Sequence, residues 1–106
     1  MTKKSRKEQL EELLAEDPND PFLRYGLAME YVSEGDDAGA VERFRAMFAD
    51  CPNYVPAYLQ AGQALTRLGR TAEAADVFRK GIEVARRQGD VHASEEMQEF
   101  LNRSEE

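Results

Sequence analysis

The residues of this chain that could do chemistry are one histidine, one cysteine and many carboxylates. His92 and Glu96 are four residues apart, so on a helix their side chains would share one face and could supply two ligands of a metal site. Protein metal sites of this kind need three or four ligands, and no other His or Cys is nearby in the sequence. We therefore interpret the pair as solvated surface residues.

Cys51 stands at the end of an apolar helical pattern, directly before Pro52. No histidine or cation is placed by the sequence to activate its thiol, so we expect a small buried apolar residue. The carboxylates, such as Glu11 and Glu12, fall on helix exteriors, and neither a Gly-rich phosphate loop nor a nucleophile motif is present. The sequence predicts that the protein is not an enzyme and has no catalytic residue, cofactor or metal.

These residues are positioned by a 34-residue repeat, in which residues 21–54 match residues 55–88. The matching pairs are Tyr31 and Leu65, Gly35 and Gly69, Ala38 and Ala72, Ala40 and Ala74, Phe44 and Phe78, and Arg45 and Arg79. A fixed period of this length indicates supersecondary units that bury their apolar faces only by stacking on one another.

The repeat resembles the tetratricopeptide repeat (TPR), a helix–turn–helix of about 34 residues. In the second copy the resemblance rests on Tyr58, Ala61, Gly62, Leu65, Gly69, Ala74 and Phe78. In the first copy it rests on Leu27, Ala28, Tyr31, Gly35, Ala40, Phe44 and Pro52. Arg24, Gly81 and Arg86 depart from the family pattern. The resemblance implies an all-α, TPR-type superhelix of antiparallel helix pairs, as in a small free-standing bacterial-type TPR protein.

Both ends of the chain extend the pattern. Leu10, Leu13, Leu14 and Pro18 lie 34 residues before Phe44, Met47, Phe48 and Pro52, and Ala93, Met97, Phe100 and Leu101 form one amphipathic stripe. We expect one complete domain, residues 1–106, made of an N-terminal half-repeat helix (1–20), TPR 1 (21–54), TPR 2 (55–88) and a C-terminal capping helix (89–106). The expected helices lie near 4–16, 20–34, 37–50, 54–68, 71–88 and 91–102.

The same patterns predict the core and the helix ends. The expected core faces are Ala40, Val41, Phe44, Met47, Phe48 and Cys51 in the first unit and Ala74, Ala75, Phe78, Ile82 and Ala85 in the second. Gly35 and Gly69 are expected to end helices in the left-handed conformation, and Asp37 or Thr71 to cap the helices that follow. Asp20 and Pro21 are typical of a helix start.

Charge and composition restrict the function and the location. The net charge is −7, made of +4 over residues 1–7, −9 over 8–54, +3 over 55–88 and −5 over 89–106. So acidic a chain is not expected to bind nucleic acid. It has no apolar stretch long enough for a membrane span, no export signal and a single cysteine, so we expect a cytoplasmic protein without membrane contact.

The resemblance implies a binding surface, because the first helix of each TPR lines the concave face. The candidate peptide-binding residues are Phe22, Tyr25, Met29, Val32, Leu59, Gln63 and Arg67, with Ser33 and Thr66 beside them and Asn53 and Gln88 near the rim. This face predicts binding of another protein, through an amphipathic helix or an extended peptide that has an apolar anchor and an acidic end. Tyr25→Ala and Arg67→Ala are expected to weaken that binding without affecting the fold.

The same fold could serve two related roles. TPR domains that grip the C-terminal carboxylate of chaperones use a Lys and two Asn residues, and the corresponding positions here are Tyr25, Met29 and Gln60, so that role is disfavoured. The alternative is a self-associating scaffold, a homodimer formed through open ends of the stack. In that case exposed apolar residues such as Met97 and Phe100 would form the contact.

Overall fold

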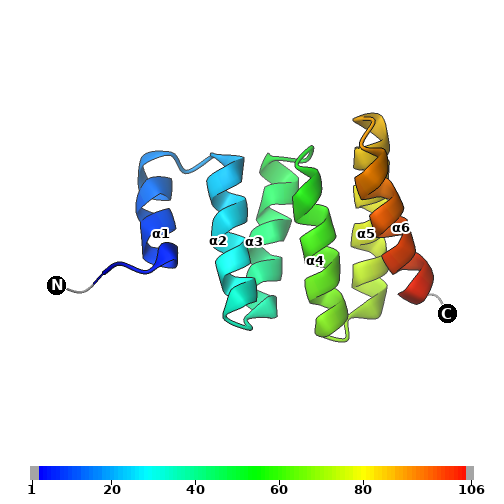
Figure 1. Ribbon diagram of the computed structural model, residues 1–106, viewed down its shortest axis with the longest axis horizontal. Helices are drawn as coiled ribbons and strands as arrows, with labels where there is room; N and C mark the ends of the chain where they lie inside the picture. The colour runs from blue at the N-terminus through cyan, green and yellow to red at the C-terminus, as the bar shows by residue number, and fades with distance from the viewer. Residues whose placement is uncertain (1–2, 105–106) are drawn as a thin grey trace.

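The computed structural model describes residues 3–104 and consists of six helices joined by short turns (Figure 1). The helices are α1 (Arg6–Glu16), α2 (Pro21–Ser33), α3 (Asp37–Asp50), α4 (Val55–Arg67), α5 (Thr71–Arg87) and α6 (Val91–Ser104). The described range contains no strand, and each helix lies within two residues of its predicted bounds. The all-α prediction is therefore confirmed. The outermost residues of the two end segments (1–2 and 105–106) lie outside the described range.

Local hydrogen bonds explain where the helices begin. The Ser5 hydroxyl accepts from the Glu8 backbone N–H, and Glu8 reaches back to Ser5, which completes a capping box for α1. Asp20 caps α2, as predicted, by accepting from the Leu23 N–H at 3.1 Å. The expected caps of α3 and α5 were wrong by one residue.

The cap of α3 is Asp36, which accepts from the Gly39 N–H at 2.9 Å, whereas Asp37 is already the first residue of the helix. Thr71 is likewise inside α5, and the preceding residue, Arg70, makes no side-chain capping bond. The turn is therefore one residue shorter than the sequence suggested. This leaves the Asp37 carboxylate available for another contact.

The glycine turns after α2 and α4 are confirmed. Gly35 and Gly69 have φ values of 80° and 76°, in the left-handed region where residues with a Cβ are strained. In the first turn the Asp36 N–H donates to the Tyr31 carbonyl at 2.9 Å, and in the second the Arg70 N–H donates to the Leu65 carbonyl at the same distance. The 34-residue repeat is thus reproduced in the backbone hydrogen bonds.

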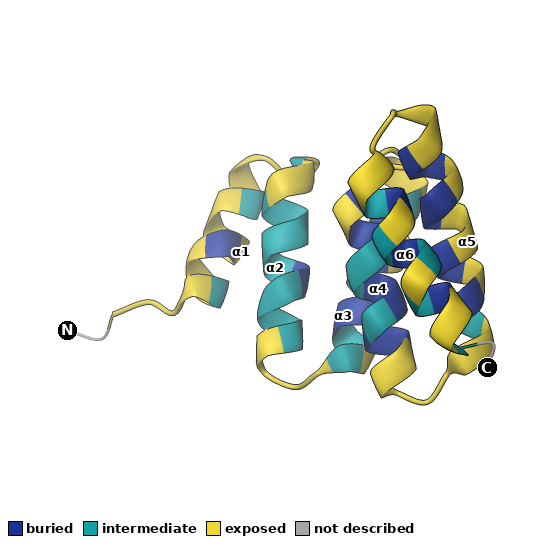
Figure 2. Ribbon diagram, turned by 45° about the vertical axis from the view of Figure 1, so that its right-hand side comes forward, coloured by how far each residue is buried: buried dark blue, intermediate teal, exposed yellow. Residues whose placement is uncertain are grey.

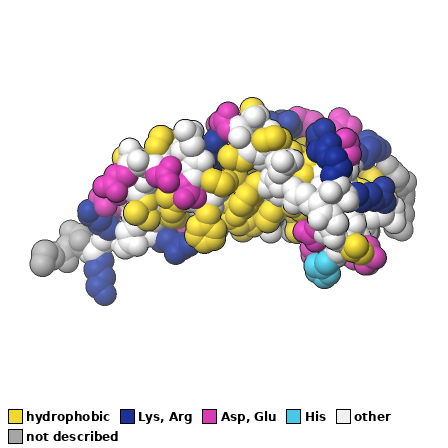
Figure 3. Space-filling view, turned by 90° about the horizontal axis from the view of Figure 1, so that it is seen from above, with side chains coloured by type: hydrophobic (Ala, Val, Ile, Leu, Met, Phe, Trp, Pro, Cys, Tyr) yellow, Lys and Arg dark blue, Asp and Glu magenta, His cyan; other side chains and the backbone are white. Residues whose placement is uncertain are grey.

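The six helices form a curved stack with extents of 51 × 28 × 21 Å. Each helix packs against the next in sequence, and α4 also contacts α6. Helices α2, α4 and α6 therefore form one layer, and α1, α3 and α5 form the other. The concave side of the stack runs along the lower edge of Figure 3 and belongs to the α2, α4 and α6 layer.

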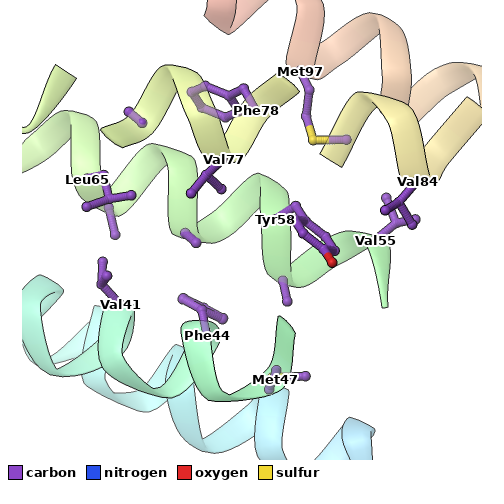
Figure 4. Packing of buried hydrophobic residues seen from close by; sticks show 14 of the residues in the cluster. Val41, Phe44, Met47, Val55, Tyr58, Leu65, Val77, Phe78, Val84 and Met97 are labelled. Atoms are coloured by element: carbon purple, nitrogen blue, oxygen red, sulfur yellow. The ribbon is translucent and has the colours of Figure 1, made fainter. Parts of the chain in front are cut away.

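The core lies between the two layers and extends from α2 to α6 (Figure 4). Phe44 and Phe78 are 0% and 1% exposed, so the predicted centre of each apolar face is confirmed. Two members of the predicted first face, Phe48 and Cys51, are only half-buried. The reason is that Phe48 lies at the α3 surface, where its ring stacks on Tyr58 at a centroid distance of 4.3 Å.

The two ends of the stack differ from the prediction. Met97, expected at an exposed open end, is fully buried, and Phe100 is half-buried because its ring stacks on Phe78 at 5.5 Å. Apolar residues are exposed on both end helices, since Val91 at the start of α6 is 62% exposed and α1, which packs mainly against α2, is largely exposed in Figure 2. Leu13 of α1 is 49% exposed.

One departure from the family pattern is explained by close packing. A Cβ at Gly81 of α5 would lie 2.6 Å from the Tyr58 Cβ and 2.5 Å from the Met97 sulfur. Real Cβ atoms do not approach other heavy atoms so closely. Glycine at this position lets α5 pack closely against both α4 and α6.

Candidate binding face

The candidate binding face is built from the exposed sides of α2, α4 and α6, which occupy equivalent places in the layer. The buried residues Tyr58, Ala61 and Leu65 of α4 have counterparts 36 residues later in Ser94, Met97 and Leu101 of α6. The offset is 36 rather than 34 because α5 is three residues longer than α3, whereas the turn after α5 is one residue shorter than the turn after α3. Helix α6 therefore extends the concave face by a third helix.

The α2 part of the face is apolar and aromatic. Phe22 is 69% exposed, whereas Tyr25, Met29 and Val32 are half-buried and pack against the core. Figure 3 shows apolar side chains gathered along this stretch of the concave edge. Of the predicted residues on α2, Phe22 is thus the one whose side chain is mainly in solvent.

Tyr25 has a structural role as well as a place on the face. Its ring lies 5.4 Å from the Tyr54 ring and 6.1 Å from the Phe44 ring, centroid to centroid. Burial raises the pKa of Tyr25, as does the nearby Tyr54, and a hydrogen bond with Gln60 lowers it. Removing this ring would disturb the core, so Tyr25→Ala does not separate binding from folding as the sequence analysis expected.

The α4 part of the face is mostly polar and uncharged. Leu59, Gln60 and Gln63 are half-buried. The Thr66 hydroxyl donates to the Gly62 carbonyl at 2.8 Å, which leaves its methyl group as the part free for other contacts. This helix offers small apolar and amide contacts but no free charge at these positions.

Arg67, the predicted cation of the face, already has a partner within the chain. Its Nε and Nη2 atoms donate to the two carboxylate oxygens of Asp37, at 3.0 and 2.9 Å. This two-point hydrogen bond raises the pKa of Arg67. The sequence analysis missed the pair, because it joins helices 30 residues apart and depends on Asp37 lying inside α3. The guanidinium of Arg67 is therefore already engaged by Asp37.

The predicted rim residues contact each other. The Gln88 side-chain amide donates to the Asn53 carbonyl at 2.6 Å, which ties the end of α5 to the turn before α4. Both residues are exposed.

The α6 part of the face is acidic. His92, Glu95, Glu96 and Glu99 line a surface hollow of about 300 Å³, and His92 projects at one end of the concave edge in Figure 3. With the 36-residue offset, these four residues correspond to Pro56, Leu59, Gln60 and Gln63 of α4. The sequence analysis missed this part of the site. The sequence does contain a signal for it, because the apolar residues of α6 repeat those of α4 after 36 residues and not after 34.

The groups considered for catalysis or metal binding give no such site. Within residues 3–104, no group of three or more His, Cys, Asp or Glu side chains is arranged to hold a metal ion. Cys51 is half-buried, and Arg24 donates to its sulfur at 3.9 Å and to Asp50 at 3.0 Å. The expectation of no cation near Cys51 was therefore wrong, since Arg24 reaches it across the helix pair.

The helices are too short or too polar to cross a lipid bilayer, as far as the described residues show.

Comparisons with known proteins agree with this fold. A family model described as tetratricopeptide repeat matches residues 55–88. A TPR repeat-containing protein of Pseudomonas aeruginosa is 31% identical over 96 residues, which cover 91% of this chain and 91% of that protein.

Two solved structures are also similar. The solution structure of a tetratricopeptide repeat domain protein from Salinibacter ruber is 36% identical, with a TM-score of 0.78, covering 83% of this chain and 89% of that one. A solution structure of a Bordetella parapertussis protein is 28% identical, with a TM-score of 0.84, covering 96% of this chain and 89% of that one. With its six stacked helices, its glycine turns and these relatives, the chain belongs to the tetratricopeptide repeat family.

Proposed function

We propose that the protein is a non-catalytic interaction module whose concave face binds a peptide or a helix of a partner protein. TPR folds in general serve protein–protein interaction, which supports the first half of this proposal. The observation that supports binding at the concave face is the exposure of Phe22, a residue predicted to lie on that face, which is 69% exposed.

Phe22 has the properties of an interface anchor. Large aromatic side chains contribute strongly to binding when a partner covers them. The half-buried residues beside it, Tyr25 and Met29, are held by the core and offer a preorganised apolar surface. A partner helix or strand that covers Phe22 would therefore gain apolar contact area without ordering much of the face.

The test is capture of partners from the native cell extract by the full chain and by two variants. We expect Phe22→Ser to lose most of the captured protein, because a true anchor contributes about 2 kcal/mol or more. The matched control is Leu13→Ser, an exposed apolar residue of α1, which should capture as much as the parent. Full capture by Phe22→Ser would overturn the concave site.

Self-association is a second candidate, favoured by the exposure of Leu13 on α1. Helix α1 packs mainly on one side, and an apolar residue on its free side can pair with the same residue of a second copy. Sedimentation of the chain over a range of concentrations tests this role. A dimer that Leu13→Ser dissociates would support the scaffold role, whereas a monomer at all concentrations would exclude it.

A further inference from the structure

The three helices of the concave face offer different chemistry in a fixed order. With the 34- and 36-residue offsets, one row of equivalent positions on α2, α4 and α6 is Tyr25, Leu59 and Glu95, and the next row is Met29, Gln63 and Glu99. Phe22 lies one turn before Tyr25, at the position of Pro56 and His92. The face therefore changes from apolar to negative along the stack. A partner segment that crosses all three helices meets these surfaces in that order.

Glu95, Glu96 and Glu99 of α6 line one surface hollow together and lack a cationic partner, whereas several carboxylates of the other helices are paired. Glu30 pairs with Arg6, Glu34 with Lys7, Asp37 with Arg67, and Glu73 with Arg45 and Arg70. No ion pair or side-chain hydrogen bond is formed by Glu95, Glu96 or Glu99 within residues 3–104. Arg103, the one Arg or Lys in α6, lies instead over the Phe100 ring, 5.1 Å from its centroid.

Unpaired like charges on one helix face repel one another, and a cation brought next to them relieves that repulsion. At the α2 side of the face, Phe22 favours an apolar group of the partner, because covering its ring removes apolar surface from water. Together the two ends specify a segment with an apolar or aromatic residue at one end and Lys or Arg at the other.

We propose that the concave face binds a cationic amphipathic segment, with its apolar anchor on Phe22 and its Lys or Arg residues against Glu95 and Glu99. This inference rests on the proposed function and specifies the chemistry of the partner. It replaces the acidic partner expected from the sequence, because Arg67 is neutralised by Asp37. With neighbouring helices of a layer about 10 Å apart, the segment spans roughly 20 Å, or about 13 residues of helix.

The experiment selects binders from a random library of peptides displayed on phage, using the full chain at low salt. We expect the enriched peptides to contain an aromatic or leucine residue together with at least two basic residues. One enriched peptide is then synthesised and titrated against the parent and three variants by fluorescence anisotropy.

The variants test separately what the α6 carboxylates and the Phe22 ring contribute to binding. Glu95→Gln/Glu99→Gln should weaken binding by about fivefold or more and reduce its dependence on salt. The control Glu11→Gln/Glu42→Gln changes the net charge equally, at exposed positions of α1 and α3, and should bind as the parent does. Phe22→Ser should weaken binding but keep the salt dependence.

Each other outcome overturns a stated part. The cationic partner would be overturned if the enriched peptides had no excess of basic residues. It would also be overturned if Glu95→Gln/Glu99→Gln and Glu11→Gln/Glu42→Gln weakened binding equally. In either case the proposed function stands if Phe22→Ser still weakens binding. Binding unaffected by Phe22→Ser, or no enrichment at all, would overturn the groove itself. A dimer of the chain that Glu95→Gln/Glu99→Gln dissociates would show that a second copy, and not a partner segment, occupies the face.

Discussion

At the scale of single residues, glycine serves two different purposes inside the helices. At Gly81 a Cβ would meet the Tyr58 Cβ at 2.6 Å, so glycine is required by packing. At Gly26 the nearest neighbour, the Leu10 Cδ2, would be 3.4 Å away, which is an ordinary contact. The two positions therefore predict opposite effects of the same substitution.

Gly81→Ala should lower the free energy of unfolding by about 1–3 kcal/mol, because the overpacked methyl group pushes α5 away from its neighbours. Gly26→Ala should leave it unchanged or raise it by up to about 1 kcal/mol, because alanine favours helix. Urea denaturation followed by circular dichroism measures both. If both substitutions changed the free energy of unfolding equally, α5 would not pack as closely against α4 as in this structure.

The pair between Arg67 and Asp37 is a second residue-scale feature with a measurable effect. It is partly exposed, with Arg67 at 45% and Asp37 at 15% side-chain exposure, so its contribution to stability should be below about 1 kcal/mol. A double-mutant cycle of Arg67→Ala and Asp37→Ala isolates that coupling energy. It should decrease as salt is added. No coupling at low salt would contradict the pairing.

At the scale of helices, α3 and α5 each place one phenylalanine at the centre of the core. Phe44 contacts the Tyr25 ring, and Phe78 stacks on Phe100 next to Gly62. Each of these rings is the largest fully buried side chain that its helix contributes to the core. Loss of either ring should affect the whole stack, because each helix depends on its neighbours.

Phe44→Ala and Phe78→Ala should each cost about 3–5 kcal/mol, enough to unfold a domain of this size in part or completely. Phe22→Ala is the matched control, because its ring is 69% exposed and its loss should change stability by less than about 0.5 kcal/mol. Thermal melting compares the three variants. If the first two melt within a few degrees of the parent, the assigned core face is wrong.

The helices show what sequence reasoning could and could not reach. The bounds of all six were predictable because glycine, proline or aspartate marks their ends, and the buried Phe44 and Phe78 were predictable from helical periodicity. The acidic part of the face was not, because it depends on the two-residue shift of α6. The pair between Asp37 and Arg67 depends on the contact between two helices, which no local pattern contains.

At the scale of the whole molecule, the stack presents two surfaces of different character. The concave layer offers apolar residues on α2, amides on α4 and unpaired carboxylates on α6, whereas ion pairs such as Arg45 with Glu73 bridge the helices α3 and α5 of the convex layer. Half-buried residues make up most of α2 in Figure 2, as expected for a preformed face. Binding should therefore involve three helices that are not consecutive in sequence.

The most direct measurement is the footprint of a captured partner on the isotope-labelled full chain, mapped by amide chemical shifts. We expect the largest changes at exposed positions of α2, α4 and α6, around Phe22, Gln63 and Glu99, because these residues share the concave face. Amides on the outer sides of α1, α3 and α5 should be nearly unchanged. Changes confined to α1 around Leu13, or to the outer surfaces of α3 and α5, would contradict binding at the concave face.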